Sequence, residues 1–473
     1  MSTSNIILDT DSYKFSHWKQ YPPKTETVFS YIESRGGIFD VTVMFNLQPY
    51  LKQVLSKPIT QEMIDEADAF VAAHVGPGIF NREGWQYILD KHNGYLPVKV
   101  TAVPEGTVVP VGNVLVTIEN TDPKCFWLPS YLETAILRAV WYGTTAATNS
   151  YAMKRIIKRY LEMTGDPSLL PFKLHDFGAR GVSSEETAAI GGAAHLVNFM
   201  GSDTVSGVLY AQKYYNTKEM LAFSIPAAEH STMTSWGGEA GEVLAMENMI
   251  DQFLKQGSIV ACVSDSYNIF NAIIQHWGTT LHDKIVKSGG VLVIRPDSGD
   301  PVEVTLQCVK LLSEKFGSSI NSKGYKVLHP SVRLIQGDGI DLEMVEKILA
   351  NFTKHGWSAD NIAFGSGGGL LQKLNRDTCK FAMKCSAIEI NKEWVDVFKK
   401  PITDPGKDSK KGRLMLYKSK RLNDYVTEIQ GGWCHFEPQS WTPMLVPVFE
   451  NGKILKEYTF AEVRANSEES QTK

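Results

Sequence analysis

Two glycine-rich turns in the last third of the chain are suited to binding an anion. Residues 336–339 read QGDG and residues 365–369 read GSGGG, and each turn directly follows a short apolar run. Glycines there let backbone N–H groups approach a phosphate, and the N-terminus of the next helix adds positive potential. One such turn would more often be only a tight turn. Two in succession favour a phosphate site at Gly337, Gly367 and Gly368.

Three aspartates also end apolar runs, where their carboxylates could hold ribose hydroxyls or Mg²⁺. They are Asp265 in VSDS, Asp297 in RPDSG and Asp338 in QGDG. Carboxylates and water are typical Mg²⁺ ligands. Each aspartate could instead be the N-cap of the following helix. The N-cap role stays open for each aspartate taken singly, but it is a poor explanation for aspartates at the ends of three separate runs.

Basic side chains near these turns are candidates for binding pyrophosphate. Arg295 ends its run as IRPD, Arg180 lies four residues after Asp176, and Arg376 and Lys384 follow the GSGGG turn. The guanidinium fork matches planar anions and phosphates. The first two could instead pair with aspartates, and the last two could be solvated surface charges.

One histidine, His230 in AAEHSTMTSWG, also follows an apolar run. A lone histidine is more often structural, held by a hydrogen bond to a neighbour. Near neutral pH, however, much of an imidazole is unprotonated and can act as a nucleophile. Because His230 ends its run as the aspartates do, both readings stay open from the residues alone.

The elements that must position these residues recur in a regular rhythm. Seven short apolar runs, each ending in small or polar residues, alternate with helix-like stretches from residue 172 onward. The spacing of their polar ends is close to the roughly 30 residues of one β–α unit. Continuous apolar strands are typical of a parallel sheet buried on both faces. The pattern favours a (β/α) barrel with its site at the strands' C-terminal ends, and a doubly wound sheet remains the alternative. The apolar runs span 172–181, 198–204, 223–231, 259–266, 291–299, 332–339 and 362–369.

The rest of the chain predicts a second, mixed region. Four short strands and two helices are expected in the first third, and a helix over 149–163 begins the barrel. A lysine-rich stretch over 399–413 is expected to form a loop, because its Pro and Gly break regular structure. We therefore expect an α/β fold with three parts: an α+β domain over 1–145, a barrel-like catalytic domain over 146–390, and a C-terminal segment over 391–473 that packs back on the first domain. The expected strands of the first third are 27–32, 98–103, 108–111 and 114–118, and the expected helices are 61–74 and 131–141.

Bulk properties narrow the class of protein. The net charge of −4 argues against a nucleic-acid partner, which usually requires a basic face. No apolar run is long enough to span a membrane, and no secretion signal is recognisable, so a cytoplasmic protein is expected. The cysteines are scattered and include no CxxC pair, which predicts reduced and mostly buried thiols. These cysteines are Cys125, Cys262, Cys308, Cys379, Cys385 and Cys434.

Beyond these patterns, the chain resembles the nicotinamide phosphoribosyltransferase family in long motifs over nearly its whole length. The resemblance implies a type II phosphoribosyltransferase: a distorted (β/α) barrel with an additional α/β domain, working as a homodimer with shared active sites. It implies transfer from phosphoribosyl pyrophosphate to nicotinamide, giving nicotinamide mononucleotide in NAD salvage, with Mg²⁺ as cofactor and ATP as co-substrate. The motifs include TDSYK (10–14), KQYPP (19–23), KLHDFGARGVSS (173–184), PAAEHST (226–232), VSDSY (263–267), IRPDSG (294–299), QGDG (336–339), AFGSGGGLLQKL (363–374) and SKKGRL (409–414).

The same resemblance implies roles for individual residues. Phe177 and the Tyr13 of the other subunit would sandwich the nicotinamide ring, and Asp203 would accept from its amide with Arg295 nearby. His230 would be the histidine that ATP phosphorylates. The remaining catalytic, ribose and phosphate roles would fall on Asp265, Asp297, Gly337, Asp338, Gly367, Gly368, Arg180, Arg35, Arg376 and Lys384. Direct Mg²⁺ ligands are not implied.

The chain also departs from the family pattern. Ala179 replaces a tyrosine of animal members, Ala382 replaces a hydroxyl residue near the pyrophosphate, and the segment after Arg35 is shorter. Because of these departures, the resemblance does not predict how tightly substrates, inhibitors or ATP bind. Two rival functions are a nicotinate phosphoribosyltransferase and a non-catalytic signalling protein on the same fold. A buried Asp203 would repel the nicotinate carboxylate, and the complete set of polar residues disfavours a non-catalytic role.

Overall fold

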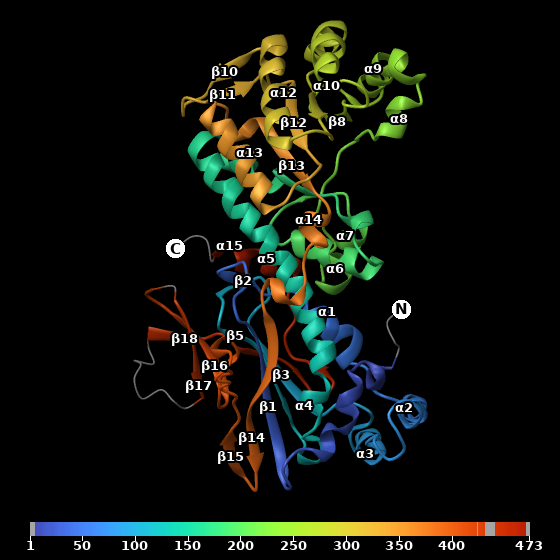
Figure 1. Ribbon diagram of the computed structural model, residues 1–473, viewed down its shortest axis with the longest axis vertical. Coiled ribbons are helices and arrows are strands. Elements are labelled where there is room, and N and C mark those ends of the chain that lie inside the picture. Colours follow the sequence, from blue (N-terminus) through green and yellow to red (C-terminus); the bar gives the residue numbers. More distant parts are fainter. Residues whose placement is uncertain (1–4, 423, 431–439, 470–473) are drawn as a thin grey trace. The chain divides into compact units, whose positions relative to one another are not determined.

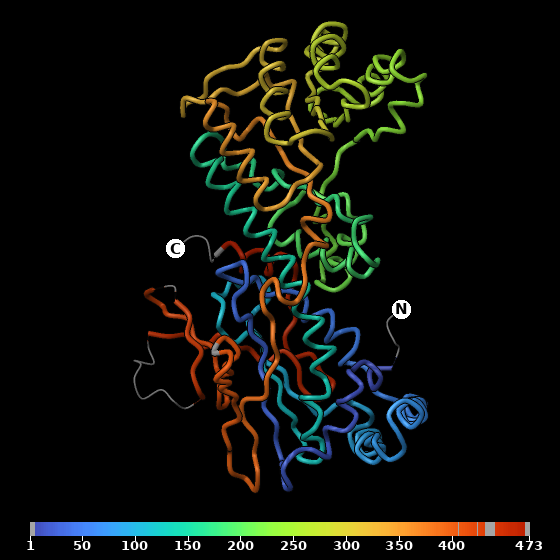
Figure 2. The backbone as a smooth tube through the Cα atoms, in the orientation of Figure 1, coloured from blue at the N-terminus to red at the C-terminus, as the bar shows by residue number. Residues whose placement is uncertain are grey.

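The computed structural model describes residues 5–422, 424–430 and 440–469, which form two compact units (Figure 1). Unit 1 contains the described residues within Met1–Thr148, Ala211–Lys218 and Asn375–Lys473; unit 2 contains Asn149–Tyr210 and Glu219–Leu374. The barrel thus ends at Leu374 rather than at the expected residue 390. The reason is that β14 (Phe381–Ile390) pairs with β1 (Thr25–Ser34) inside unit 1, as the backbone trace shows (Figure 2).

Unit 1 is built on a seven-stranded antiparallel sheet in the order β15-β14-β1-β5-β3-β19-β20. Strand β1 lies in the interior of the sheet, between β14 and β5, and is buried over most of its length, as its apolar sequence VFSYI requires. Smaller sheets pair β2 with β4, and β16 with β17 and β18. The remaining strands are β2 (Val41–Val43), β3 (Val98–Ala102), β4 (Val108–Pro110), β5 (Val114–Asn120), β15 (Glu393–Asp396), β16 (Leu414–Ser419), β17 (Tyr425–Ile429), β18 (Trp441–Pro443), β19 (Val446–Glu450) and β20 (Lys453–Ile454).

Of the two helices expected in the first third, the one over 61–74 forms with the predicted bounds. Helix α2 (Gln61–His74) begins where the Thr60 side chain accepts from the Met63 N–H, a standard N-cap. The two helices expected over 131–141 and 149–163 are instead one 32-residue helix, α5 (Glu133–Thr164). The intervening threonines fit a helix because Thr145 and Thr148 donate to the carbonyls four residues earlier. The other helices of unit 1 are η1 (Ile6–Leu8), η2 (Ser12–Lys19), α1 (Leu47–Tyr50), η3 (Leu51–Leu55), α3 (Arg82–His92), η4 (Pro123–Cys125), α4 (Leu128–Tyr131), η10 (Arg376–Thr378), η11 (Pro405–Lys407) and α15 (Phe460–Glu469).

Unit 2 is a curled parallel sheet of six strands in the order β7-β6-β13-β12-β9-β8. The expected strand over 223–231 does not form. Pro226 has no N–H to donate, and the segment makes only two isolated parallel bridges, Gly201 to Phe223 and Ala227 to Ala261. These bridges join the segment to both edge strands, so it completes a distorted barrel. The strands are β6 (Leu174–Asp176), β7 (Gly201–Ser202), β8 (Ile259–Val263), β9 (Val291–Arg295), β12 (Val332–Gln336) and β13 (Ile362–Ser366).

Alternate residues of the barrel strands face two different environments. Leu292, Ile294 and Leu334 belong to the large core between the strands and their helices. Val293 and Ile335 form a separate apolar cluster with Ala261 on the opposite face. The sheet therefore encloses an interior lined by small and branched side chains. The helices and hairpin of unit 2 are η5 (Pro167–Phe172), η6 (Ala179–Gly181), α6 (Glu185–His195), α7 (Val205–Tyr214, which continues into unit 1 after Tyr210), α8 (His230–Thr234), η7 (Gly238–Gly241), α9 (Glu242–Phe253), α10 (Ile269–Asn271), η8 (Ala272–Thr280), α11 (His282–Ser288), α12 (Pro301–Phe316), β10 (Ser318–Ile320), β11 (Lys326–Leu328), α13 (Leu342–Lys354), η9 (Ala359–Asn361) and α14 (Gly368–Leu371).

The state of the cysteines and the absence of long apolar runs, both expected from the sequence, can be checked in the described residues. Five cysteines are free thiols and four of them are buried, as the scattered spacing predicts; Cys434 lies outside the described residues. Within the same ranges, no helix combines the length and the apolar character that crossing a membrane requires.

Candidate active site

The interior of the barrel in unit 2 holds a cavity of about 750 Å³. Its walls are the inward-facing side chains of the strands, among them Ala261, Val293 and Ile335. A mostly apolar cavity with a few polar groups at its ends is the usual form of a small-molecule site. The residues at the strands' C-terminal ends include the polar side chains of Arg180, Asp203 and Arg295 and the Phe177 ring, as the sequence pattern predicts.

The Phe177 ring packs against the two glycine-rich turns. A Cβ atom added to Gly365 would lie 1.9 Å from Phe177 Cε2, and one added to Gly337 would lie 3.4 Å from the same atom. The Phe177 N–H also donates to the Ser366 carbonyl, at 2.9 Å. These glycines therefore make room for an aromatic ring, a role that the sequence analysis did not assign to them.

Asp176 supports this turn from beneath and was not predicted as a site residue. It is fully buried, and its Oδ1 accepts from the Gly178 N–H at 2.7 Å, while Oδ2 has no hydrogen-bond partner. Burial raises the pKa of the Asp176 carboxyl to about 6, and the nearby Asp203 adds to the rise. An aspartate two residues before a glycine is a common turn signal, which is the sequence feature that could have identified it.

Asp203 and Arg295 place complementary polar groups on the cavity wall. Asp203 is exposed and accepts from the Ser224 hydroxyl. The expectation of a buried Asp203 is therefore wrong in this chain, because β7 ends one residue earlier and leaves the carboxylate at the cavity mouth. Arg295 is half-buried; its Nη2 pairs with Asp297 Oδ2 at 3.5 Å, as the sequence alternative allowed, while its Nε has no hydrogen-bond partner. The mouth thus offers one acceptor and one unpaired donor.

His230, Asp265 and Asp297 are brought together, as predicted. His230 Nε2 lies 3.6 Å from Asp265 Oδ1 and 3.6 Å from Asp297 Oδ2. The other ring nitrogen, Nδ1, lies 3.1 Å from the Ser266 hydroxyl. The imidazole is accessible, with 45% of its side chain exposed, so it is not a core histidine. Ser266 is a further residue that the sequence analysis did not single out.

Asp265 organises the turn behind this histidine. Its Oδ2 accepts from the Asp297 N–H at 2.8 Å and from the Ser298 hydroxyl at 2.5 Å. Its Oδ1 is buried without a hydrogen-bond partner and faces His230. Asp265 is therefore not an N-cap; it ties the strand ends of β8 and β9 together and leaves one oxygen for a cation.

The other residues expected at this edge lie at the ends of β12 and β13. Asp338 is exposed, and its carbonyl accepts from the Gln336 side chain at 3.1 Å. Gly367 has backbone angles of φ −106° and ψ −104°, and Gly368 has open space where a side chain would be. Arg180 is exposed on η6 and lines the cavity.

Four predicted residues belong to unit 1 instead. Tyr13 is 62% exposed on η2, with its ring edge-on to His17. Arg35 pairs with Glu33 at 3.2 Å, and Arg376 is exposed beside Asp377. Lys384 is half-buried on β14, and burial, more than its cationic neighbours, lowers its pKa. The other substituted position, Ala382, lies opposite Glu33 on the same pair of strands.

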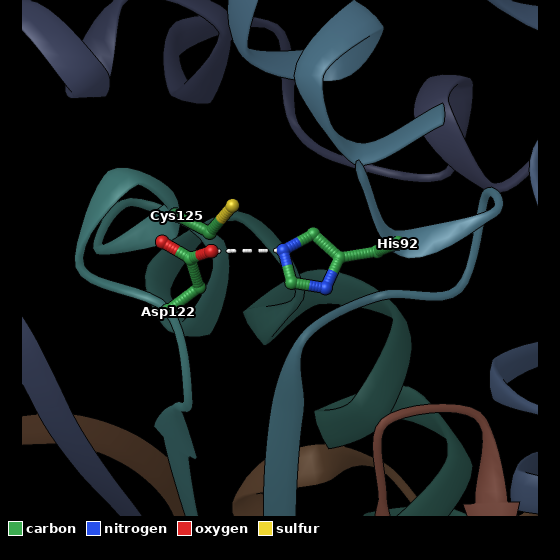
Figure 3. Close-up of side chains that lie close together, drawn as sticks. All are labelled: His92, Asp122 and Cys125. Atoms are coloured by element: carbon green, nitrogen blue, oxygen red, sulfur yellow. Dashed lines mark hydrogen bonds and ion pairs between the residues drawn. The ribbon is translucent and has the colours of Figure 1, made fainter. Parts of the chain in front are cut away.

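Among the described residues, one group of three potential metal ligands has all its ligand atoms within 4.8 Å of one another: His92, Asp122 and Cys125 in unit 1 (Figure 3). Asp122 already accepts from His92 at 2.8 Å, from the Tyr87 hydroxyl at 3.0 Å and from a backbone N–H at 2.8 Å. Burial raises the pKa of the Cys125 thiol to about 12. These hydrogen bonds account for the arrangement, and we assign it no metal.

Comparison with known sequences identifies the family. A model of the nicotinate phosphoribosyltransferase (NAPRTase) family matches residues 172–442, and a model of the nicotinamide phosphoribosyltransferase N-terminal domain matches residues 5–100. The nicotinamide phosphoribosyltransferase of Xanthomonas campestris pv. campestris (strain 8004) is 54% identical over 466 residues, 98% of each chain. The chain belongs to the nicotinamide phosphoribosyltransferase family. The family member of Acinetobacter baylyi (strain ATCC 33305 / BD413 / ADP1) is 32% identical and covers 97% of this chain and 96% of its own.

Solved structures confirm the type II phosphoribosyltransferase fold of this family member. A nicotinate-nucleotide pyrophosphorylase from Pyrococcus furiosus superposes with a TM-score of 0.62, at 16% identity, over 99% of this chain and 96% of the other. Human nicotinic acid phosphoribosyltransferase gives a TM-score of 0.57, at 15% identity, over 98% and 93%. At such identities the likeness concerns the fold alone.

Proposed function

We propose that this enzyme transfers the phosphoribosyl group of phosphoribosyl pyrophosphate to nicotinamide, giving nicotinamide mononucleotide and pyrophosphate in NAD salvage. The observation that supports this substrate most directly is that Asp203 and Arg295 both line the cavity whose wall also carries Phe177. A carboxamide has an NH₂ that donates and a C=O that accepts. A carboxylate and an unpaired guanidinium N–H are the matching partners, and the Phe177 ring offers a face for the flat base.

The nearest alternative substrate is nicotinate, whose carboxylate would meet the carboxylate of Asp203. Two neighbouring carboxylates repel each other, so nicotinate should be the poorer base. Purified protein incubated with phosphoribosyl pyrophosphate and either base, with product measured by chromatography, tests the proposal. Product from nicotinate but not from nicotinamide would overturn it.

Removing the charge of Asp203 should narrow this selectivity. In Asp203→Asn the side chain keeps its size but its amide can present a donor to the base. Because a hydrogen bond to a charged group is worth about 1.5–3 kcal/mol, we expect kcat/KM for nicotinamide to fall roughly tenfold or more. The nicotinamide-to-nicotinate ratio of kcat/KM should fall with it. An unchanged ratio in steady-state assays would exclude Asp203 as the selecting residue.

In the proposed reaction the pyridine nitrogen attacks C1 of the ribose as pyrophosphate leaves. The ring nitrogen carries no proton, so no general base is required. Phe177 would orient the base in line for attack, and Arg180 with the turns at Gly337 and Gly367 would bind phosphate oxygens. Charge that develops on the leaving group is stabilised best by groups already fixed in place.

The acidic residues beside His230 fit a magnesium ion. Asp265 Oδ1 is a buried carboxylate oxygen without a hydrogen-bond partner, and Asp297 lies next to it across His230. Mg²⁺ is usually held by one or two carboxylates together with waters and substrate phosphates. When bound, it would neutralise charge on the departing pyrophosphate.

ATP is proposed as a co-substrate that phosphorylates His230 and so enhances the reaction. The exposed Nε2 between two aspartates supports this role, since a nucleophile must be accessible and a neighbouring carboxylate can orient it. A cytoplasmic location and an absence of nucleic-acid or membrane partners belong to the same proposal, supported by the free thiols and the small net charge.

A homodimer with shared active sites is the last part of the proposal. Two large apolar side chains one helical turn apart on α7, Val205 and Leu209, are 68% and 59% exposed, which suits a protein partner. Tyr13 is likewise exposed, so its ring is free to cover the base bound by the other subunit.

Shared sites predict recovery of activity when two inactive variants are mixed. Tyr13→Ala removes one face of the base sandwich, and Asp297→Ala removes a carboxylate beside His230. Each mixed dimer would contain one intact composite site, so we expect activity of up to about a quarter of wild type after statistical exchange. The measurement is product formation after subunit exchange verified with a size tag. Exchange without recovery would argue for sites contained in one chain.

A further inference from the structure

The β1–β14 face of unit 1 carries a group of charged residues, of which Arg35 and Lys384 already have phosphate-binding roles implied by the family resemblance while Glu33 and Lys410 have none. Tyr31 and Glu33 alternate along β1 and so point to the same side of the sheet. Lys384 lies directly opposite Tyr31 in the antiparallel pairing, which places its side chain on that same side. Arg35 follows at the end of the strand, two residues beyond Glu33.

Glu33 holds two cations at once. Its carboxylate is 2% exposed; Oε1 accepts from Arg35 Nε at 3.2 Å, and Oε2 accepts from Lys410 Nζ. Lys410 comes from the lysine-rich loop, 377 residues further along the chain. Its backbone N–H donates to the Tyr31 hydroxyl at 2.9 Å, so the main chain is fixed as well as the ammonium group.

The Tyr31 hydroxyl completes the arrangement as a neutral group. Burial raises the pKa of Tyr31 to about 12, with the Glu33 charge adding to the rise, while the Lys410 N–H bond and Arg35 oppose it. The phenol therefore keeps its proton and can donate toward Glu33 Oε1, at 3.4 Å. Glu33 is thus a buried carboxylate with every near partner a donor.

This group leaves donors unused. Arg35 Nη2 is buried and has no hydrogen-bond partner. The Lys410 ammonium has three donors, and the described residues account for one of them, while 29% of its side chain is exposed. Burial lowers the pKa of Lys384 most; the charges of Arg35, Lys399 and Lys14 add to this effect and Glu133 opposes it, so each of these groups lies near Lys384. Unpaired buried donors beside an excess of positive charge are the features of a site for a polyanion.

We infer that Lys410 is a further pyrophosphate-binding side chain and that Glu33 is the positioning residue that holds Lys410 beside Arg35. The inference rests on the proposed function, which supplies a substrate and a product that carry pyrophosphate. The negative charge of Glu33 offsets the repulsion between Arg35 and Lys410. Its two ion pairs also fix both side chains before the anion binds. Preorganised donors bind an anion more tightly because they lose less freedom on binding.

A purely structural alternative makes different predictions. If the Glu33–Lys410 pair served only to hold the loop on the sheet, Lys410→Met would lower the melting temperature and affect both substrates alike. If Glu33 acted only as a nearby negative charge, Glu33→Gln would tighten the binding of pyrophosphate. A positioning role predicts weaker binding in both variants.

The test measures binding of inorganic pyrophosphate, in the presence of Mg²⁺, to the full-length protein by titration calorimetry. We expect Kd to rise about tenfold in both Lys410→Met and Glu33→Gln, the scale of one lost charge-assisted hydrogen bond. The matched control is Lys411→Met, since the neighbouring Lys411 pairs with exposed Asp396 at 3.5 Å and should bind as wild type does. In assays, KM for phosphoribosyl pyrophosphate should rise while KM for nicotinamide stays unchanged.

The outcomes separate this inference from the proposed function. Unchanged pyrophosphate affinity in Lys410→Met, with wild-type melting, overturns the role of Lys410, and tighter binding in Glu33→Gln overturns that of Glu33. Equal losses of pyrophosphate affinity in Lys411→Met and Lys410→Met would mean that any nearby positive charge has this effect. That result would also overturn the inference. If wild type binds pyrophosphate as expected but makes no nicotinamide mononucleotide, the proposed function fails while the anion site stands.

Discussion

Replacement of His230 by alanine should remove ATP-dependent phosphorylation altogether. Incubation of wild type with γ-labelled ATP is expected to give an acid-labile, base-stable label, and His230→Ala should carry none. ATP hydrolysis should fall at least about 1,000-fold, because loss of a nucleophile removes the covalent route rather than weakening it. Slow synthesis without ATP should remain, since Asp203 and Phe177 are untouched. The expected gain from ATP arises because a phosphoryl group on His230 would share cations with the substrate pyrophosphate.

A second histidine provides the control. His282 also contacts an aspartate, Asp283, at 3.0 Å, but it begins helix α11, which follows another helix rather than a barrel strand. His282→Ala should be labelled as wild type is. Equal labelling of the wild type and His230→Ala would show that the acceptor is another residue, and the structural reading of His230 would then hold.

The regular part of the fold could be predicted because local sequence decides it. The helix over Pro301–Phe316 begins with Asp300 as N-cap and Pro301 in the first turn, and its apolar residues recur at helical spacing. The strands of the barrel are continuous apolar runs whose polar ends share one edge. That rule brought His230, Asp265 and Asp297 together correctly without any knowledge of tertiary structure.

The remaining features depend on contacts between distant parts of the chain. The strand expected over 223–231 is reduced to two isolated bridges, because Pro226 has no backbone N–H to donate. These bridges join the segment to the edge strands β7 and β8 on either side. Pairing of β14 with β1 moves residues 375–390 out of the barrel, although nothing in their own sequence distinguishes them from barrel strands. Local patterns carry no information on such pairings.

The site shows the same division. The residue types and their edge of the sheet were predictable, but the degree of exposure was not, since Asp203 lies at the mouth of the cavity rather than inside it. The packing of Phe177 on Gly365 was also not predictable, because the two residues are joined only by the pairing of β6 with β13. Sequence suggested an anion-binding role for the glycine-rich turn, and the structure adds a steric one.

That steric role predicts a large effect from a single methyl group. In Gly365→Ala the new Cβ would lie 1.9 Å from Phe177 Cε2 and 2.2 Å from Cδ2, so the ring must move. A reacting group displaced by about 1 Å can cost roughly 100-fold in rate, and we expect kcat/KM for nicotinamide to fall by that order. The matched control is Gly181→Ala, on η6 in the loop that carries Phe177, whose Cβ would approach no atom closer than 3.6 Å. Steady-state kinetics with nicotinamide varied would measure both.

A double-mutant cycle separates displacement of the ring from general damage to the strand. Phe177→Ala alone removes the ring and should lose activity to a similar extent. Once the ring is absent, the added methyl of Gly365→Ala has nothing to strike, so the double variant should be scarcely worse than Phe177→Ala. Overpacking typically costs about 1–3 kcal/mol of stability. The double variant should therefore melt at a higher temperature than Gly365→Ala alone. Additive losses of activity would mean that Gly365 acts independently of Phe177, through the backbone of the β13 turn, because residues that act through one contact are non-additive.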